Sequence, residues 1–169
     1  YQINPVQTEK LYSAAIGLAG LTGNEIVLDA YCGIGTIGLS ASDKAKQVIG
    51  IEINRDAVND AIANARLNGV KNCWFTVGDA GKYMEQMAAD KVKPDIVFMD
   101  PPRAGSDERF LSSLLKCAPK RIVYISCNID TQRRDLDVLL SGGYKLRRIQ
   151  PVDMFPYTEH IECVVMLSL

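Results

Sequence analysis

Short apolar runs rich in β-branched residues recur along the chain and alternate with longer segments of mixed polarity. The runs over residues 26–29, 47–52, 73–77, 95–99 and 121–125 have the length and composition of buried strands. The fourth run stops at Asp100-Pro101-Pro102, where proline ends the strand pattern. The pattern therefore predicts five strands before residue 126.

Helical periodicity fills the gaps between these runs. Helices are predicted over residues 8–18, 55–68, 80–89, 108–117 and 131–140, and a tight glycine turn at 33–40 feeds a further helix. Asn54 is a suitable N-cap and Gly69 a suitable stop for the second helix. Two more strands, over residues 145–151 and 161–169, have no helical pattern between them. The prediction is an α/β fold with a mostly parallel seven-stranded sheet and an antiparallel last strand.

Composition fits one globular domain over residues 1–169. The chain is 47% hydrophobic and 23% charged, with a mean hydropathy near zero. No apolar run approaches the roughly 20 residues that a membrane helix needs. Because Tyr1 opens within what looks like a motif, we expect a fragment of a longer protein, monomeric and without a signal peptide.

Cysteine usage and charge narrow the functional class. The five cysteines include no Cys-x-x-Cys pair, so we expect a reducing cytoplasm and neither a disulfide framework nor a metal site. Net charge is −1 and the pI is about 5.9, whereas nucleic-acid-binding domains are usually basic. If the substrate is RNA, its binding must therefore depend on local contacts with this domain or on affinity supplied by another domain.

The segment from Gly33 to Gly38 matches Gly-x-Gly-x-x-Gly, and Glu52 follows at nearly the spacing of a ribose-binding acid. Taken alone, this pattern also suits an NAD-linked oxidoreductase or an unliganded turn. Three residues separate Asp29, at the end of the strand, from Gly33, an approach that suits a cofactor without phosphates. Asp79 follows the third strand and is either an adenine acceptor or a helix N-cap. These features, with the antiparallel last strand, favour a Rossmann-like S-adenosylmethionine-dependent methyltransferase fold.

A thiol and a carboxylate are the candidates for catalysis. Cys127 follows the fifth strand and precedes a predicted helix, whose N-terminus would favour a thiolate. Glu162 opens an otherwise apolar strand, which is costly unless the carboxylate is used. Arg103, after Asp100-Pro101-Pro102, could reach a substrate carbonyl or phosphate.

With these motifs in place, the chain resembles the RNA 5-methyluridine methyltransferases. The resemblance covers nearly the whole chain and rests on segments 1–4, 29–36, 64–69, 100–105, 124–128 and 153–162. The Ser126-Cys127-Asn128 segment and the Met154-Phe155-Pro156 segment that leads to His160-Ile161-Glu162 are its most specific parts.

The resemblance implies methyl transfer from S-adenosylmethionine to C5 of a uridine, in ribosomal RNA rather than transfer RNA. It implies Cys127 as nucleophile and Glu162 as general base, and we expect Arg103 and Asn128 to contact the substrate. The implied cofactor residues are Gln2, Tyr31, Gly33, Glu52, Asp79 and Asp100. Family members usually carry an N-terminal RNA-binding domain, so we expect one in the full-length protein. A non-catalytic RNA-binding module on the same fold is the remaining rival.

Overall fold

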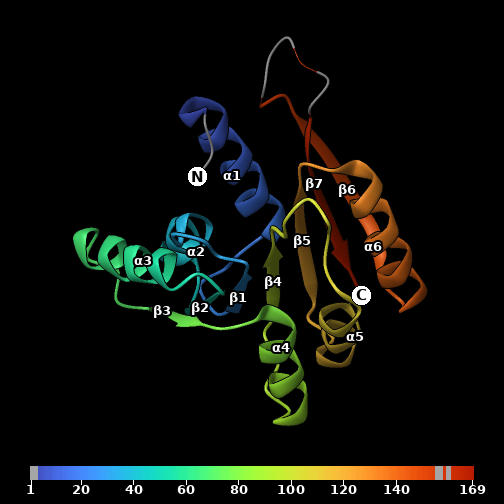
Figure 1. Ribbon diagram of the computed structural model, residues 1–169, viewed down its shortest axis with the longest axis horizontal. Coiled ribbons are helices and arrows are strands. Elements are labelled where there is room, and N and C mark those ends of the chain that lie inside the picture. The colour runs from blue at the N-terminus through green and yellow to red at the C-terminus, as the bar shows by residue number, and fades with distance from the viewer. Residues whose placement is uncertain (1–3, 155–157, 159–160) are drawn as a thin grey trace.

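The computed structural model describes residues 4–154, 158 and 161–169, which form one α/β unit (Figure 1). Its helices are α1 (Pro5–Ala19), α2 (Thr36–Ala41), the 3₁₀ turn η1 (Ser42–Lys44), α3 (Arg55–Leu67), α4 (Ala80–Ala89), α5 (Glu108–Cys117) and α6 (Ile129–Ser141). Its strands are β1 (Ile26–Ala30), β2 (Gln47–Glu52), β3 (Cys73–Val77), β4 (Ile96–Met99), β5 (Arg121–Ser126), β6 (Lys145–Val152) and β7 (Glu162–Ser168).

The sheet has the predicted composition of parallel and antiparallel pairs. Its strand order is β3-β2-β1-β4-β5-β7-β6. The pairs from β3 to β5 are parallel, whereas β7 is antiparallel to both β5 and β6. The predicted fold class is therefore confirmed, including the reversed last strand.

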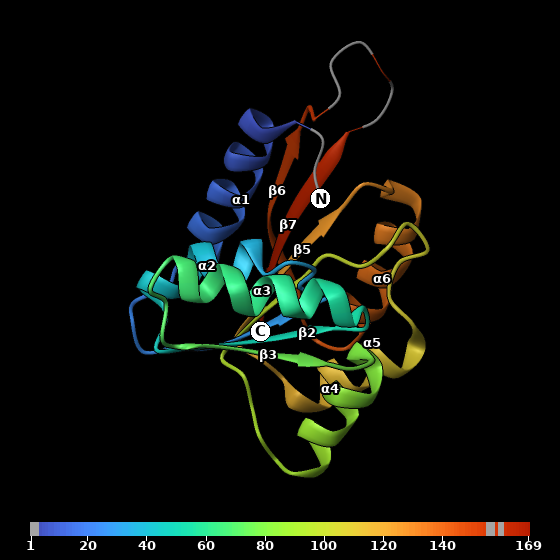
Figure 2. The same cartoon turned by 60° about the vertical axis from the view of Figure 1, so that its left-hand side comes forward.

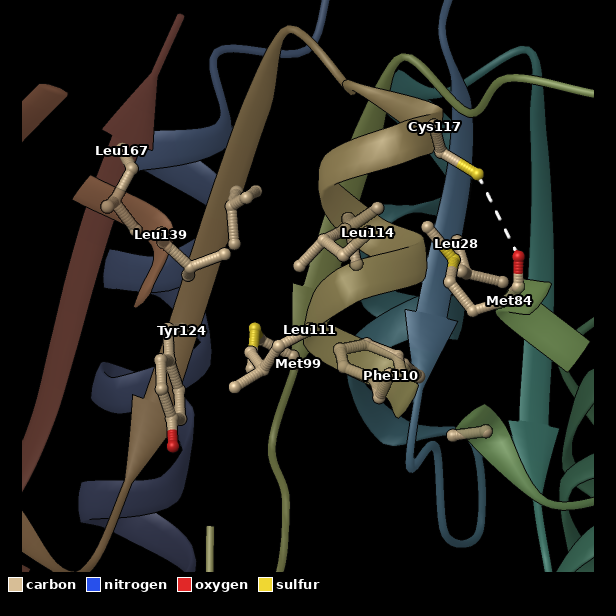
Figure 3. Packing of buried hydrophobic residues seen from close by; sticks show 14 of the residues in the cluster. Leu28, Met84, Met99, Phe110, Leu111, Leu114, Cys117, Tyr124, Leu139 and Leu167 are labelled. Carbon is tan, nitrogen blue, oxygen red and sulfur yellow. Dashed lines mark hydrogen bonds between the residues drawn. The ribbon is translucent and has the colours of Figure 1, made fainter. Parts of the chain in front are cut away.

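Helices cover both faces of the sheet (Figures 1 and 2). One apolar core joins α4, α5 and α6 to one face, and Figure 3 shows Phe110 and Leu114 of α5 within it. A second core joins α1 and α2 to the other face. Successive residues of a central strand enter different cores, as Tyr124 and Val123 of β5 do. This two-sided burial accounts for the continuous apolar runs in the sequence.

Several element boundaries differ from the prediction for local reasons. Helix α6 begins at Ile129 rather than at residue 131, because the Asn128 side chain accepts from the amides of Asp130 and Thr131. Helix α1 likewise begins at Pro5, with Asn4 as its N-cap. Strand β7 begins at Glu162 rather than at residue 161, and Ile161 has a relative exposure of 42%.

The topology brings one end of several strands together. The carboxyl ends of β1, β2, β4 and β5 lie at the same edge of the sheet, because these strands are parallel. The amino end of β7 lies there too, because β7 runs antiparallel to β5. The candidate residues at or just after the carboxyl ends of β1, β2, β4 and β5 thus share one edge of the sheet with Glu162, which opens β7. Up to 133 positions separate them in the sequence, from Asp29 to Glu162.

Candidate functional site

The loop after β1 has an unusual backbone. Tyr31, Gly33 and Gly35 all have positive φ, at 64°, 53° and 82°. A tyrosine in the left-handed region is uncommon, and its strain requires support from the surrounding structure. Here the Cys32 amide donates to Ile51 O at 2.9 Å, and the Gly33 amide donates to Oε2 of Glu52 at 3.0 Å. The end of β2 therefore fixes the loop.

The glycines of this loop have different roles. A Cβ on Gly35 would lie 2.9 Å from the Phe75 ring and 3.0 Å from Ala61, so close packing accounts for this glycine. A Cβ on Gly33 would meet no atom within 4 Å. Gly33 therefore lies beside open space, and only its backbone conformation restricts it.

A pocket of about 720 Å³ lies between the glycine loop and α1. Of the predicted cofactor residues, Tyr31, Gly33 and Asp100 line it. Glu52 is not in its lining but is tied to it through the Gly33 amide. Gln2 lies outside the described residues.

One wall of this pocket was missed by sequence reasoning. It is formed by α1, through residues that include Thr8, Tyr12 and Ile16. The cap at Asn4 and the helical pattern predict that α1 exists, but no local signal predicts where it packs.

Negative charge gathers at this end of the sheet. Asp29 is buried, and burial raises its pKa to about 7. The hydrogen bond from the Gly38 amide, 2.9 Å from Oδ2, lowers this pKa, whereas the negative charge of Glu52 raises it further. Burial likewise raises the pKa of Asp100 to about 7, and the charges of Glu162 and Asp29 add to the effect. Such an environment favours a cationic ligand over an anionic one.

Asp79 has a structural role in this chain. Its side chain accepts from the Lys82 amide at 2.8 Å and caps α4. This bond accounts for an aspartate at the position without any ligand. The adenine contact stays a prediction, and Asp79 is absent from the pocket lining.

The pairing of β5 with β7 brings the predicted nucleophile and the predicted base to the same end of these two strands. Ser126, the last residue of β5, is opposite Cys163, so Cys127 and Glu162 are each the next residue beyond this last pair. The Gln132 amide locks this end of the pair by donating to Tyr124 O at 3.3 Å and Cys163 O at 3.1 Å.

The two groups differ in their surroundings. Glu162 has a relative exposure of only 3%; burial raises its pKa, and the positive charge of Arg103 opposes the rise. Cys127 is half-buried and directly precedes the Asn128 cap of α6. The arrangement has a half-buried thiol at the same end of the β5–β7 pair as a buried carboxyl group whose pKa is raised.

Asn128 is engaged with the protein itself. Its Oδ1 accepts from the amides of Asp130 and Thr131 at 3.0 and 3.4 Å, and its Nδ2 donates to Arg103 O at 3.2 Å. These bonds join the nucleophile loop to the loop that carries Arg103. The predicted substrate contact of Asn128 stays a prediction, as does that of the exposed Arg103 side chain.

Three observations on the described part of the chain concern metal ions, membranes and disulfides. No group of three or more metal-ligating side chains occurs within it. None of its helices is long and apolar enough to cross a membrane. All five cysteines are free thiols.

Comparison with known proteins gives a consistent result. The sequence model of the tRNA (uracil-5-)-methyltransferase family matches residues 2–169. An uncharacterized RNA methyltransferase of Halalkalibacterium halodurans is 53% identical over 100% of this chain and 37% of its own length. The chain thus spans a little over a third of such relatives.

Comparison with solved structures agrees with the sequence comparisons. The tRNA (uracil-54, C5)-methyltransferase of Pyrococcus abyssi, crystallised with S-adenosyl-L-homocysteine, superposes with a TM-score of 0.83. It is 34% identical, and the match covers 99% of this chain and 39% of that one. A precorrin-6y C5,15-methyltransferase from Geobacter metallireducens has a TM-score of 0.75 at 14% identity over 95% of this chain and 88% of that one, a likeness of fold alone.

Proposed function

Because the chain belongs to the tRNA (uracil-5-)-methyltransferase family, we propose that it transfers a methyl group from S-adenosylmethionine to C5 of a uridine in RNA. The observation that supports the proposal is the β5–β7 register: its last pair, Ser126 and Cys163, directly adjoins Cys127 and Glu162, at the edge of the sheet where Asp100 lines the pocket. A nucleophilic thiol and a nearby base are what C5 methylation of uracil requires.

The pocket fits S-adenosylmethionine better than a dinucleotide. The cofactor carries an ammonium and a sulfonium charge, which suit the acidic surroundings of Asp100 and Asp29. A pyrophosphate would be repelled there, which argues against the NAD-linked alternative. Both oxygens of Glu52 already accept backbone amides, yet a carboxylate has further lone pairs that ribose hydroxyls can use. Bound S-adenosylmethionine supplies the electrophilic methyl group.

Cys127 begins the proposed reaction. C5 of uracil is a weak nucleophile, so the thiolate adds to C6 and moves the ring electrons onto O4 and C5. We assign Arg103, whose charge acts on Glu162, to stabilising the resulting enolate oxygen. The uridine must leave its base stack to reach the thiol, as in other enzymes that modify bases.

Glu162 completes the proposed reaction. Once C5 carries the methyl group, its proton becomes acidic, and the Glu162 carboxylate removes it. The electrons left on C5 re-form the C5–C6 double bond and expel the Cys127 thiolate. A general base works best when its pKa is near the working pH, and burial moves Glu162 in that direction.

The class of the substrate RNA is a separate part of the proposal. Ribosomal RNA is the substrate that we propose, and transfer RNA is the alternative favoured by the named substrate of the Pyrococcus abyssi relative. The net charge of −1 provides little counterion release for RNA binding. We therefore propose that an additional domain of the full-length protein supplies most of the RNA affinity.

The test is methylation by the full-length protein with S-adenosylmethionine and either ribosomal or transfer RNA. We expect mass spectrometry to find 5-methyluridine at a discrete site in ribosomal RNA. Cys127→Ala should abolish the product and leave S-adenosylmethionine affinity within about twofold, since the thiol is assigned to the pyrimidine. Product in transfer RNA alone would reassign the substrate. A Cys127→Ala variant that retains a tenth of the activity would eliminate the covalent route.

A further inference from the structure

Helix α6 holds the loop that follows β4 through its backbone. The carbonyl of Arg103 accepts from Nδ2 of Asn128 and from Oγ1 of Thr131, the latter at 3.0 Å. One turn later, Nη2 of Arg134 donates to the carbonyls of Ala104 and Ser106 at 3.1 and 3.0 Å. Residues 103–106 thus have three successive attachments to one face of this helix.

Asp135 anchors these attachments from inside the protein. Its side chain has no exposure and accepts from the Ser106 amide and the Tyr124 hydroxyl, both at 2.8 Å. Its other oxygen accepts from Nε and Nη2 of Arg134, at 2.9 and 2.6 Å. A buried carboxylate is tolerated only when it is paired and fully hydrogen-bonded, so these partners are held together.

Gly105 shows how closely the loop lies against this pair. A Cβ there would be 2.6 Å from Nη2 of Arg134 and 2.8 Å from Oδ2 of Asp135. Its φ of 78° is also in the region that favours glycine. The loop has no room to shift toward α6, and its hydrogen bonds oppose a shift away.

The loop in turn is connected to the proposed cofactor pocket and to the proposed general base. Tyr31, which lines the pocket, donates its hydroxyl to Oγ of Ser106 at 3.3 Å. Arg103 acts electrostatically on Glu162. We infer that Arg134 and Asp135 are positioning residues that hold Arg103 and Tyr31 in place relative to Cys127. This role rests on the proposed function.

The sharpest variant is Arg134→Lys in the full-length protein. The Arg134 side chain has a relative exposure of 56%, so the fold should survive, and lysine keeps the charge that RNA phosphates would attract. A lysine ammonium cannot reproduce the planar, forked contacts of arginine. Arg133→Lys, at the neighbouring exposed position, is the matched control. Asp135→Asn is a second variant that removes the anchoring charge.

Measurements of kcat and KM distinguish a positioning role of Arg134 from a purely structural one. We expect Arg134→Lys to lower kcat roughly 10-fold or more, with KM for RNA within about twofold, because reacting groups are displaced while charge is retained. If the pair acts through Arg103, adding Arg134→Lys to Arg103→Gln should lower kcat by no more than about twofold further. Arg133→Lys should behave like the wild type.

Two results would overturn the inference while leaving the proposed function intact. One is a normal kcat in Arg134→Lys and Asp135→Asn, whatever their melting temperatures. The other is fully multiplicative losses for Arg103→Gln and Arg134→Lys. If the wild type itself makes no 5-methyluridine, the proposed function fails instead.

Discussion

Replacing Asp29 with asparagine should make the protein more stable at alkaline pH. Asp29 has a relative exposure of 1%, and its side chain forms one hydrogen bond, from the Gly38 amide. Within the described residues it has no ion pair. An asparagine oxygen can accept the same amide without introducing a buried charge.

The magnitude follows from the pKa of Asp29, which burial raises from 3.8 to about 7. A difference of about 3 pH units corresponds to roughly 4 kcal/mol, at about 1.36 kcal/mol per unit. Between about pH 4 and pH 7 the native protein keeps a proton that the unfolded chain has lost. Stability therefore falls as pH rises through this window, and the Asp29→Asn substitution removes that contribution.

Urea unfolding of the unliganded chain at pH 5, 6, 7 and 8 measures the effect. We expect the advantage of Asp29→Asn over the wild type to grow from about 1–2 kcal/mol at pH 5 to about 4 kcal/mol at pH 8. Asp43→Asn, on the exposed side of η1, is the matched control and should follow the wild type. Parallel wild-type and Asp29→Asn curves from pH 5 to 8 would refute the assignment of a proton to buried Asp29.

Two further predictions concern the glycine loop and the pocket. Gly35→Ala should lower the free energy of unfolding by about 2–3 kcal/mol, because the φ of Gly35 is 82° and the added Cβ would lie 2.9 Å from Phe75. Gly69→Ala, where φ is 66° and no atom lies within 4 Å of the added Cβ, should lower it by only about 1 kcal/mol. Equal losses in the two variants would contradict this steric account. Calorimetry should find that S-adenosylmethionine affinity weakens as pH falls below about 7, because protonation of Asp100 removes a charge beside the cationic cofactor. Asp100→Asn should bind weakly with little pH dependence, and an equally steep pH dependence in that variant would exclude Asp100 as the group responsible.

Much of the fold could be predicted from the sequence because apolar periodicity reports directly on burial. The two-sided cores produced the apolar runs of β1, β4 and β5, and the missing helix before β7 indicated its reversal. The location of Cys127 and Glu162 at one edge of the sheet was also predictable, because Cys127 follows β5 and Glu162 opens β7, which is antiparallel to β5. Local capping by Asn128 was the reason that α6 started earlier than expected.

The network around Asp135 could not be predicted in this way. Its bond to the Ser106 amide joins residues 29 positions apart, and nothing in either local pattern indicates the partner. A buried aspartate within an amphipathic helix looks like any solvated charge until the tertiary packing is known. The contribution of α1 to the pocket escaped prediction for the same reason.

The covalent role of Cys127 with Glu162 as base is tested most directly by trapping the intermediate. Glu162→Gln in the full-length protein cannot take the C5 proton, so addition and methyl transfer should occur once and elimination should stall. A protein–RNA adduct should then survive denaturing electrophoresis, and adding Cys127→Ala should remove it. Normal multiple turnover by Glu162→Gln, with no adduct, would contradict the assignment.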